Sequence, residues 1–213
     1  MDLVTHGFGV LLLASLLPDG VCGAEVYDTG QVVAPADAAL APGASDARRR
    51  DFALGRACAR AALAQAGHLA AGVIERAAHG APLWPDGFTG SITHTSGYAA
   101  AIAARTDAFA GLGVDAERAD RVEEGLFARL FDAGERAFLA AHRQPRAMAA
   151  LLFSAKEAAF KASNPPAGAA LHFQQLHIEV RDESRFGVDT MPDACGRYLF
   201  KDGLVLTCLW RVR

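Results

Sequence analysis

Length, composition and charge place this chain among ordinary globular proteins. Its 213 residues can bury a sizeable core, either as one domain or as two halves of about 100 residues each. A hydrophobic fraction of 52% with 21% charged residues excludes a disordered protein, and a formal charge of -3 gives no reason to expect nucleic-acid binding. No stretch reaches the roughly 20 apolar residues that would span a bilayer.

Four dispersed cysteines favour reduced thiols in a cytoplasmic protein. They form no C-x-x-C pair, so neither a zinc knuckle nor a redox dithiol is predicted. An apolar run from Phe8 to Leu17 superficially resembles the core of a signal peptide. No Lys or Arg precedes this run and Asp2 stands there instead, so a buried strand is favoured over a secretion signal.

Strand and turn signals occupy the first part of the chain. Val10 to Leu17 and Cys22 to Tyr27 are predicted strands on either side of a Pro18-Asp19-Gly20 turn. An Ala/Pro-rich connection follows. Asp46 is then predicted to cap a helix that ends near Ala66, with Gly67 as its stop.

A loop and three extended segments come next. Residues 82–90 contain two prolines and two glycines, which predicts a loop. The predicted strands are Ser91 to Thr95, Tyr98 to Arg105 and Phe109 to Glu117. If the Thr106-Asp107 turn closes a hairpin, the segment that begins near His94 and the segment that ends at Glu117 run back to back, and their far ends meet. His94 and Asp115 would then reach the same rim of a sheet.

The second half is predicted to hold three helices followed by strands. The helices are expected at Glu123 to Phe131, Asp132 to His142 and about Arg146 to Ala162. Asp132 and Glu135 form a capping box at the start of the second, and Asn164-Pro165-Pro166 ends the third. The strands are expected at His172 to Val180 and at Tyr198 to Val212, the latter around a turn at Lys201-Asp202-Gly203.

Carboxylates gather in two short stretches of this pattern. On a strand, Asp115 and Glu117 project from one face, about 7 Å apart. On a helix, Ser154, Glu157 and Lys161 lie along one face at spacings of three and four. Magnesium prefers oxygen ligands and bridges to substrate phosphates. The three carboxylates therefore predict a cation site, with Lys161 placed to offset charge on a phosphate.

Lysine is scarce in this chain, which draws attention to the second stretch. Only Lys156, Lys161 and Lys201 occur among the 21 basic residues. Lys156 points about 100° away from Glu157 on the helix, so a salt bridge and a phosphate contact both stay open for it. Taken singly, each stretch is also consistent with a solvated strand end and a surface ion pair worth at most about 0.5 kcal/mol.

Together with two upstream segments, these stretches resemble the motifs of a known family. Gly113 to Glu117 carries Gly-x-Asp-x-Glu, and Phe153 to Lys161 carries Phe-Ser-x-Lys-Glu-Ala-x-x-Lys. Phe52 to Arg60 and Trp84 to Thr95 are similar to N-terminal motifs of the same family. In this order the four segments resemble the 4′-phosphopantetheinyl transferase superfamily, in its enterobactin synthase component D-like branch. Phe153 stands where that family frequently has tryptophan.

The resemblance implies a fold and a reaction. The fold is α/β (α+β), a pseudo-dimer of two similar halves, each a small, mainly antiparallel sheet packed with helices. We expect the halves at residues 1–110 and 111–213, with the active site in the cleft between them, in a monomer. The reaction transfers the phosphopantetheine arm of coenzyme A to a serine of an apo carrier protein of nonribosomal peptide, siderophore or polyketide pathways. It needs Mg²⁺ and releases adenosine 3′,5′-bisphosphate.

The resemblance also implies roles for individual residues at the metal and the phosphates. Asp115 and Glu157 would hold Mg²⁺, with Glu117 as a direct or a water-mediated ligand. Glu157 would also be the base that activates the carrier serine, directly or through a water. Lys161 would offset charge on the phosphates, and His94 would contact the phosphates of coenzyme A.

Further contacts to coenzyme A are implied in the N-terminal half. Some family members bind the 3′-phosphate through lysines in this region. This chain has no lysine before Lys156, so either Arg56 with Arg49 or Arg50 would take that role or the contact would be absent. The other expected contacts are Trp84 and Pro85 at the adenine, Thr93 beside His94, and Lys156 and Lys161 from the second half.

Two other functions stay open from the residues alone. A non-catalytic module would keep a cleft for coenzyme A without turnover, although the complete set of carboxylates and lysines argues against such a loss. A serine hydrolase would use Ser91 or Ser96 with His94. Because the chain has no G-x-S-x-G elbow and the serines lie too close to the histidine along a strand, this alternative is disfavoured.

Overall fold

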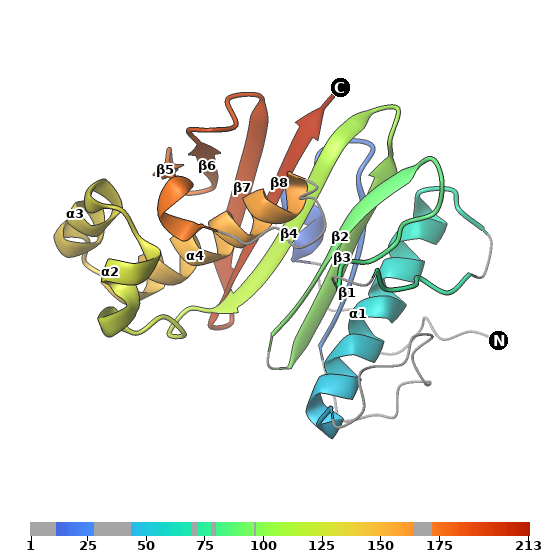
Figure 1. The fold of residues 1–213 in the computed structure, drawn as a ribbon, viewed down its shortest axis with the longest axis horizontal. Helices are drawn as coiled ribbons and strands as arrows, with labels where there is room; N and C mark the ends of the chain where they lie inside the picture. The colour runs from blue at the N-terminus through green and yellow to red at the C-terminus, as the bar shows by residue number, and fades with distance from the viewer. Residues whose placement is uncertain (1–11, 28–43, 70–71, 78–79, 96, 164–171) are drawn as a thin grey trace.

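The computed structural model describes residues 12–27, 44–69, 72–77, 80–95, 97–163 and 172–213. Two antiparallel sheets lie side by side, and each has a long helix against it (Figure 1). This is the α+β architecture of two sheet-and-helix halves that the sequence predicts. Among the described residues, no helix is both long and apolar enough to cross a membrane.

The first sheet comes from the N-terminal half. Its three strands are β1 (Cys22–Tyr27), β2 (Phe88–Thr95) and β3 (Tyr98–Arg105), in the order β1-β3-β2. Helix α1 (Asp46–Gln65) packs against them. Its N-cap is Ser45 and not the predicted Asp46, since the Ser45 hydroxyl accepts the Arg48 N–H. Gly67 follows the helix with φ +96°, as its stop role requires.

The second sheet has five strands, of which β4 is an edge and β8 its neighbour. Their bounds are β4 (Phe109–Arg118), β5 (Ile178–Val180), β6 (Arg185–Val188), β7 (Ala194–Lys201) and β8 (Leu204–Val212), in the order β4-β8-β7-β6-β5. Helix α4 (Pro145–Ala162) packs on β4 and β8. The predicted turn between β7 and β8 is present, with Asp202 and Gly203 both at positive φ.

Shorter helices complete the described fold. They are the 3₁₀ segments η1 (Leu13–Leu16), η2 (Glu124–Leu126) and η3 (Phe173–Gln175), and the helices α2 (Phe127–Leu130) and α3 (Ala133–Ala141). The predicted capping box at the start of α3 is confirmed, with Asp132 and Glu135 each accepting the other's backbone N–H. The helix predicted at Glu123 to Phe131 is split into η2 and the single turn of α2.

Three predictions about strands are wrong. Val10 to Leu17 is not a strand where it is described, because η1 forms there and the Glu25 carboxylate accepts the N–H groups of Leu12 and Leu13. The Thr106-Asp107 turn closes no hairpin, because β3 already pairs with β1 and β2 while β4 pairs with β8. Only the last three residues of His172 to Val180 form a strand, and β6 was not predicted.

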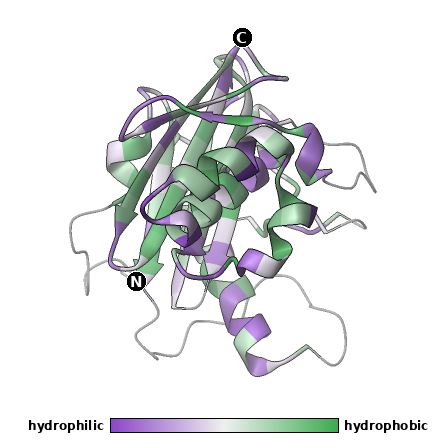
Figure 2. Ribbon diagram, turned by 90° about the vertical axis from the view of Figure 1, so that its left-hand side faces the viewer, coloured by the Kyte–Doolittle hydropathy of each residue, from purple (hydrophilic) through white to green (hydrophobic). Residues whose placement is uncertain are grey.

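The apolar core lies in three clusters. One lies between α1 and the first sheet, and one between α4 and the second sheet. The third joins the halves: Ile102 of β3 packs there with Val114 of β4 and Leu206 of β8, and η1 contributes Leu13 and Leu16. Figure 2 shows hydrophobic colour along the strands in the middle of the molecule. The two sheets therefore share a core, and their edges β2 and β4 come into contact.

Candidate active site

Gly113 brings α4 unusually close to β4. A Cβ atom at Gly113 would lie 1.8 Å from the carbonyl oxygen of Ala158, so only glycine allows the observed approach. A buried hydrogen bond of 2.8 Å between the hydroxyls of Ser154 and Thr207 ties the same helix to β8. The first residue of Gly-x-Asp-x-Glu therefore positions the helix that carries Glu157 next to the strand that carries the aspartate.

Asp115 is the centre of the site that this approach creates. It is 5% exposed, and its Oδ1 accepts hydrogen bonds from the Thr93 hydroxyl at 3.1 Å and from Lys161 Nζ at 2.7 Å. Its Oδ2 is buried and has no hydrogen-bond partner among the described residues. Leaving a buried polar atom without a partner costs about 1–3 kcal/mol, more for a charged group. This oxygen is therefore suited to a ligand, and above all to a cation.

Two glutamates add negative charge beside Asp115. Burial, and then the charge of Asp115, raise the pKa of Glu117 to about 7, although Arg121 Nε lies 3.2 Å from its Oε2. Burial also raises the pKa of Glu157; the charge of Asp115 adds to this, and Lys161 opposes it. Lys161 and Arg121 offset only part of the negative charge of the three carboxylates, and the oxygen donors of the cluster suit a hard divalent cation. The oxygens of the three residues do not all approach within 4.8 Å of one another.

The strand β2 contributes hydroxyl groups to the same place. Ser91 Oγ accepts the Val114 N–H at 3.1 Å, and Thr93 Oγ1 accepts the Ala116 N–H at 3.1 Å. β2 and β4 belong to different sheets. Hydrogen bonds from these two side chains to the backbone therefore connect the strands in place of a backbone ladder. Sequence reasoning missed this role of Ser91, since no pattern shows that a buried serine will bond to the backbone of another strand.

His94 joins the site to the start of α1. Arg48 Nη1 lies 2.9 Å from His94 Nε2, and because arginine can only donate, Nε2 accepts and the ring proton is on Nδ1. Asp51 Oδ2 lies 3.9 Å from that Nδ1. Burial and the Arg48 charge lower the pKa of His94, so the ring is neutral at pH 7. Of these partners, only Arg48 had a sequence signal, as part of a run of three arginines.

The three arginines expected at the 3′-phosphate all lie on α1, and they differ in burial. Arg49 lies on the first turn of α1 and pairs with Asp46 at 2.5 Å. Arg56 is buried two turns later, with its guanidinium 4.7 Å from the centre of the Phe52 ring and its Nε without a hydrogen-bond partner. Burial, and then the nearby Arg76, lower the pKa of Arg56. Arg50, between them, is half-buried.

The expected adenine contacts lie near β2. Trp84 and Pro85 are half-buried, and Trp84 packs against the cluster between α1 and the first sheet. A Cβ atom at Gly90 would lie 2.6 Å from the Trp84 ring, so the indole covers the backbone of β2. The indole is thus a packed side chain at the edge of this half.

Lys156 does not join the candidate site. It is fully buried, and its ammonium group lies 2.6 Å from Glu135 Oε2, 2.6 Å from the Phe173 carbonyl oxygen and 3.2 Å from the Leu130 carbonyl oxygen. All three ammonium protons are thereby used inside the second half. Of the two roles left open by the sequence, the salt bridge is the one that the structure contains, and the expected contact with coenzyme A finds no support.

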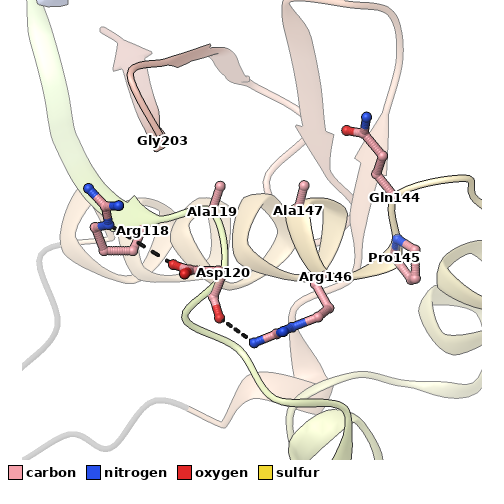
Figure 3. Close-up of a pocket in the computed structure, with 8 residues that line it drawn as sticks. All are labelled: Arg118, Ala119, Asp120, Gln144, Pro145, Arg146, Ala147 and Gly203. Atoms are coloured by element: carbon pink, nitrogen blue, oxygen red, sulfur yellow. Dashed lines mark hydrogen bonds and ion pairs between the residues drawn. The ribbon is translucent and has the colours of Figure 1, made fainter.

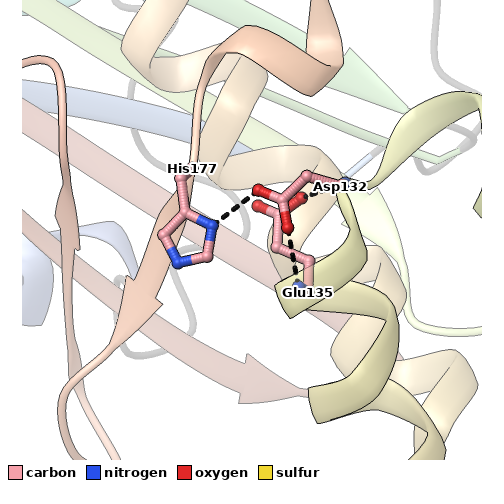
Figure 4. Close-up of side chains that lie close together, drawn as sticks. All are labelled: Asp132, Glu135 and His177. Carbon is pink, nitrogen blue, oxygen red and sulfur yellow. Dashed lines mark hydrogen bonds and ion pairs between the residues drawn. The ribbon is translucent and has the colours of Figure 1, made fainter.

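The Lys156 network includes three side chains whose potential ligand atoms lie close enough together to hold a metal ion. They are Asp132, Glu135 and His177 (Figure 4). His177 Nδ1 lies 2.6 Å from Asp132 Oδ2, and this hydrogen bond raises the pKa of His177. Both oxygens of Glu135 are also bonded, to Lys156 and to the backbone of Asp132 and Ile178. Every carboxylate oxygen therefore already has a protein partner, and we interpret the group as structural.

A shallow pocket of about 530 Å³ lies at the far end of β4, between its last residues and the first turn of α4 (Figure 3). Arg118 and Arg146 line it, and Arg146 donates to the Asp120 carbonyl oxygen at 2.7 Å. The first turn of α4 is about 18 Å along the helix from Glu157. On the α4 side the pocket is therefore far from Glu157, whereas on the β4 side it begins at Arg118, the residue after Glu117.

Comparisons with known proteins agree on one family. Residues 36–104 match the model of the 4′-phosphopantetheinyl transferase N-terminal domain, and residues 111–208 match that of the 4′-phosphopantetheinyl transferase superfamily. The 4′-phosphopantetheinyl transferase Npt of Nocardia iowensis is 34% identical over 93% of this chain and 99% of its own length. The 4′-phosphopantetheinyl transferase PptT of Mycobacterium tuberculosis is 34% identical over 93% of this chain and 97% of its own length. Enterobactin synthase component D of Salmonella typhi is 39% identical over 38% of this chain and 34% of its own.

Proposed function

The chain belongs to the 4′-phosphopantetheinyl transferase family, and from this we propose that it is a Mg²⁺-dependent enzyme that serves carrier proteins of nonribosomal peptide, siderophore or polyketide pathways. The family reaction transfers phosphopantetheine from coenzyme A to a carrier serine and releases adenosine 3′,5′-bisphosphate. Siderophore carriers are suggested by the similarity to an enterobactin synthase component.

One observation supports the metal-dependent part of this proposal above the others. Asp115 has one oxygen held by Thr93 and Lys161 and the other buried without a partner. Asp115 and Glu157 would hold Mg²⁺, with Glu117 as a third ligand, directly or through water. When bound, the cation would offset the charge that develops on the pyrophosphate oxygens during transfer.

Glu157 and Lys161 are the residues that we assign to the chemistry of transfer. The raised pKa of Glu157 brings the carboxyl closer to the working pH, which suits a group that takes the proton of the carrier serine. Lys161 Nζ lies 2.7 Å from Asp115 Oδ1, so its charge is available next to the phosphates. The serine oxygen then attacks the β-phosphorus, and the bisphosphate leaves.

The N-terminal half, residues 1–110, would hold the nucleotide end of coenzyme A, and residues 111–213 would supply the metal ligands. His94, with its Nδ1–H, would donate to a phosphate oxygen, and Arg48 lies beside it. Arg56 Nε is a buried donor without a partner, which supports an anion near this arginine. The remaining assignments are Arg49, Arg50, Trp84 and Pro85, in an enzyme that we expect to be monomeric.

The test is transfer to apo carriers followed by intact-protein mass spectrometry. With coenzyme A and Mg²⁺, at least one carrier from a panel of the three pathway types should gain the mass of one phosphopantetheinyl group. Asp115→Asn and Glu157→Gln should each reduce the rate by at least about 100-fold. Glu179→Gln, an exposed position, is the control and should match wild type. Tight binding of coenzyme A without any mass gain would contradict the proposal and favour a non-catalytic module.

A further inference from the structure

The hydroxyl of Thr93 lies where the two halves of the molecule meet. Thr93 is 4% exposed, and its Oγ1 lies 3.1 Å from Asp115 Oδ1 and 3.1 Å from the Ala116 nitrogen. A backbone N–H can only donate, so the threonine oxygen accepts from Ala116. The single proton of the hydroxyl is then directed at Asp115, and none is left for a phosphate.

The direction of that proton decides how Asp115 is held. Oδ1 accepts from Thr93 on β2 and from Lys161 on α4, which are elements of different halves. Both donors act on the same oxygen, so the carboxylate cannot rotate without losing them. Oδ2, buried and without a partner, is thereby kept in one orientation.

We propose that Thr93 is a positioning residue for Asp115, and not a contact for coenzyme A: from the N-terminal half it orients the metal-binding carboxylate of the C-terminal half. The inference rests on the proposed function, since it takes Asp115 as a metal ligand. It also gives a reason for the contact between β2 and β4, because cation binding in one half depends on a hydroxyl from the other.

Ser91 provides a matched control on the same strand. It lies two residues before Thr93, faces the same side, is also 4% exposed, and accepts a backbone N–H of β4 at the same distance of 3.1 Å. In the part of the chain that the structure describes, its hydroxyl forms no hydrogen bond to a carboxylate. Removing this hydroxyl should weaken the contact between β2 and β4 without changing the hydrogen bonds to Asp115.

The experiment measures Mn²⁺ binding, by electron paramagnetic resonance of the free ion, in the presence of coenzyme A. Thr93→Val, which keeps the size of the side chain, should weaken Mn²⁺ binding about 10–100-fold. Thr93→Ser should restore most of the affinity, and Ser91→Ala should keep the wild-type value. In transfer assays, Thr93→Val should raise the Mg²⁺ concentration for half-maximal rate more than it raises the KM for coenzyme A.

Two results would overturn the inference. Equal losses of Mn²⁺ affinity in Thr93→Val and Ser91→Ala would show that Mn²⁺ binding depends only on the contact between β2 and β4. A raised KM for coenzyme A with unchanged Mn²⁺ affinity would make Thr93 a substrate contact. Circular dichroism checks the fold, and Thr93→Ala replaces the valine variant if the latter does not fold. A wild-type protein without transfer activity would contradict the proposed function, whereas the Mn²⁺ comparison does not depend on turnover.

Discussion

At the residue scale, two lysines five positions apart on α4 have opposite surroundings. Lys161 keeps 27% of its side chain exposed and lies beside Asp115, whereas Lys156 is fully buried against Glu135. Both belong to the same motif, and helix geometry separates them, because five residues rotate a side chain by about 500°, or 140° net. A shared motif therefore does not imply a shared site.

Lys156→Met should destabilise the protein without changing its use of coenzyme A. The methionine fills the space but leaves the Glu135 carboxylate buried and unpaired, which should cost about 3–5 kcal/mol. Urea unfolding measures this loss, and the KM for coenzyme A is measured on the folded protein. Lys201→Met, at the exposed end of β7, should have wild-type stability. Unchanged stability with a raised KM would make Lys156 a coenzyme A ligand after all.

Glu117 should make the metal-free protein less stable as the pH rises. Its folded pKa is about 7 against an ordinary 4.5, so the folded state holds a proton that the unfolded state has lost between these values. The penalty is absent below about pH 4.5 and complete above about pH 7. Discounted for solvent screening of this partly exposed carboxyl, it is about 1 kcal/mol.

Glu117→Gln removes that proton equilibrium. In EDTA we expect the variant to melt about 2–4 °C above wild type at pH 8 and at the same temperature as wild type at pH 5. His94, whose lowered pKa has the opposite effect on stability, is present in both proteins and cancels in the difference. A gain of equal size at both pH values would show that charge on Glu117 is not the cause.

At the element scale, the spacing of Gly113 from Ala158 sets the position of α4. Gly113→Ala should push the helix off β4, with a loss of about 1–3 kcal/mol in the free energy of unfolding. Transfer should fall about 100-fold, since Glu157 and Lys161 move relative to Asp115. Gly125→Ala, where a Cβ atom meets nothing within 4 Å, is the control. A fully active Gly113→Ala enzyme would contradict this account of the motif.

Local signals predicted the elements that depend on local chemistry. The Asp132 capping box and the Lys201-Asp202-Gly203 turn involve neighbouring residues, and both are present. The partner of β4 could not be predicted, because the Thr106-Asp107 turn signal does not say which sheet receives the next strand. For the site, the resemblance of both motifs to one family predicted that Asp115 and Lys161 would share a site, but the Thr93 bond to Asp115 depends on how two sheets meet.

At the scale of the whole molecule, the two halves share a core. The cluster between the sheets contains residues of η1 and β3 from one half and of β4 and β8 from the other. Arg197 of β7 also donates to the Leu17 carbonyl oxygen at 3.3 Å. Unfolding one half would expose apolar surface of the other, so we expect a single cooperative transition in spite of two sheets.

The two tryptophans allow this cooperativity to be measured, because each contacts a different cluster. Trp84 packs against the cluster between α1 and the first sheet, and Trp210 belongs to the cluster between the sheets. Trp210→Phe leaves Trp84 as the only indole, and Trp84→Phe leaves Trp210. In each variant, urea unfolding followed by fluorescence should coincide with unfolding followed by circular dichroism. Loss of the Trp84 signal at a urea concentration where most secondary structure remains would mean that the first half unfolds alone. In that case the bond from Thr93 to Asp115 would join two independently stable units, and Mg²⁺ should then raise the midpoint of both.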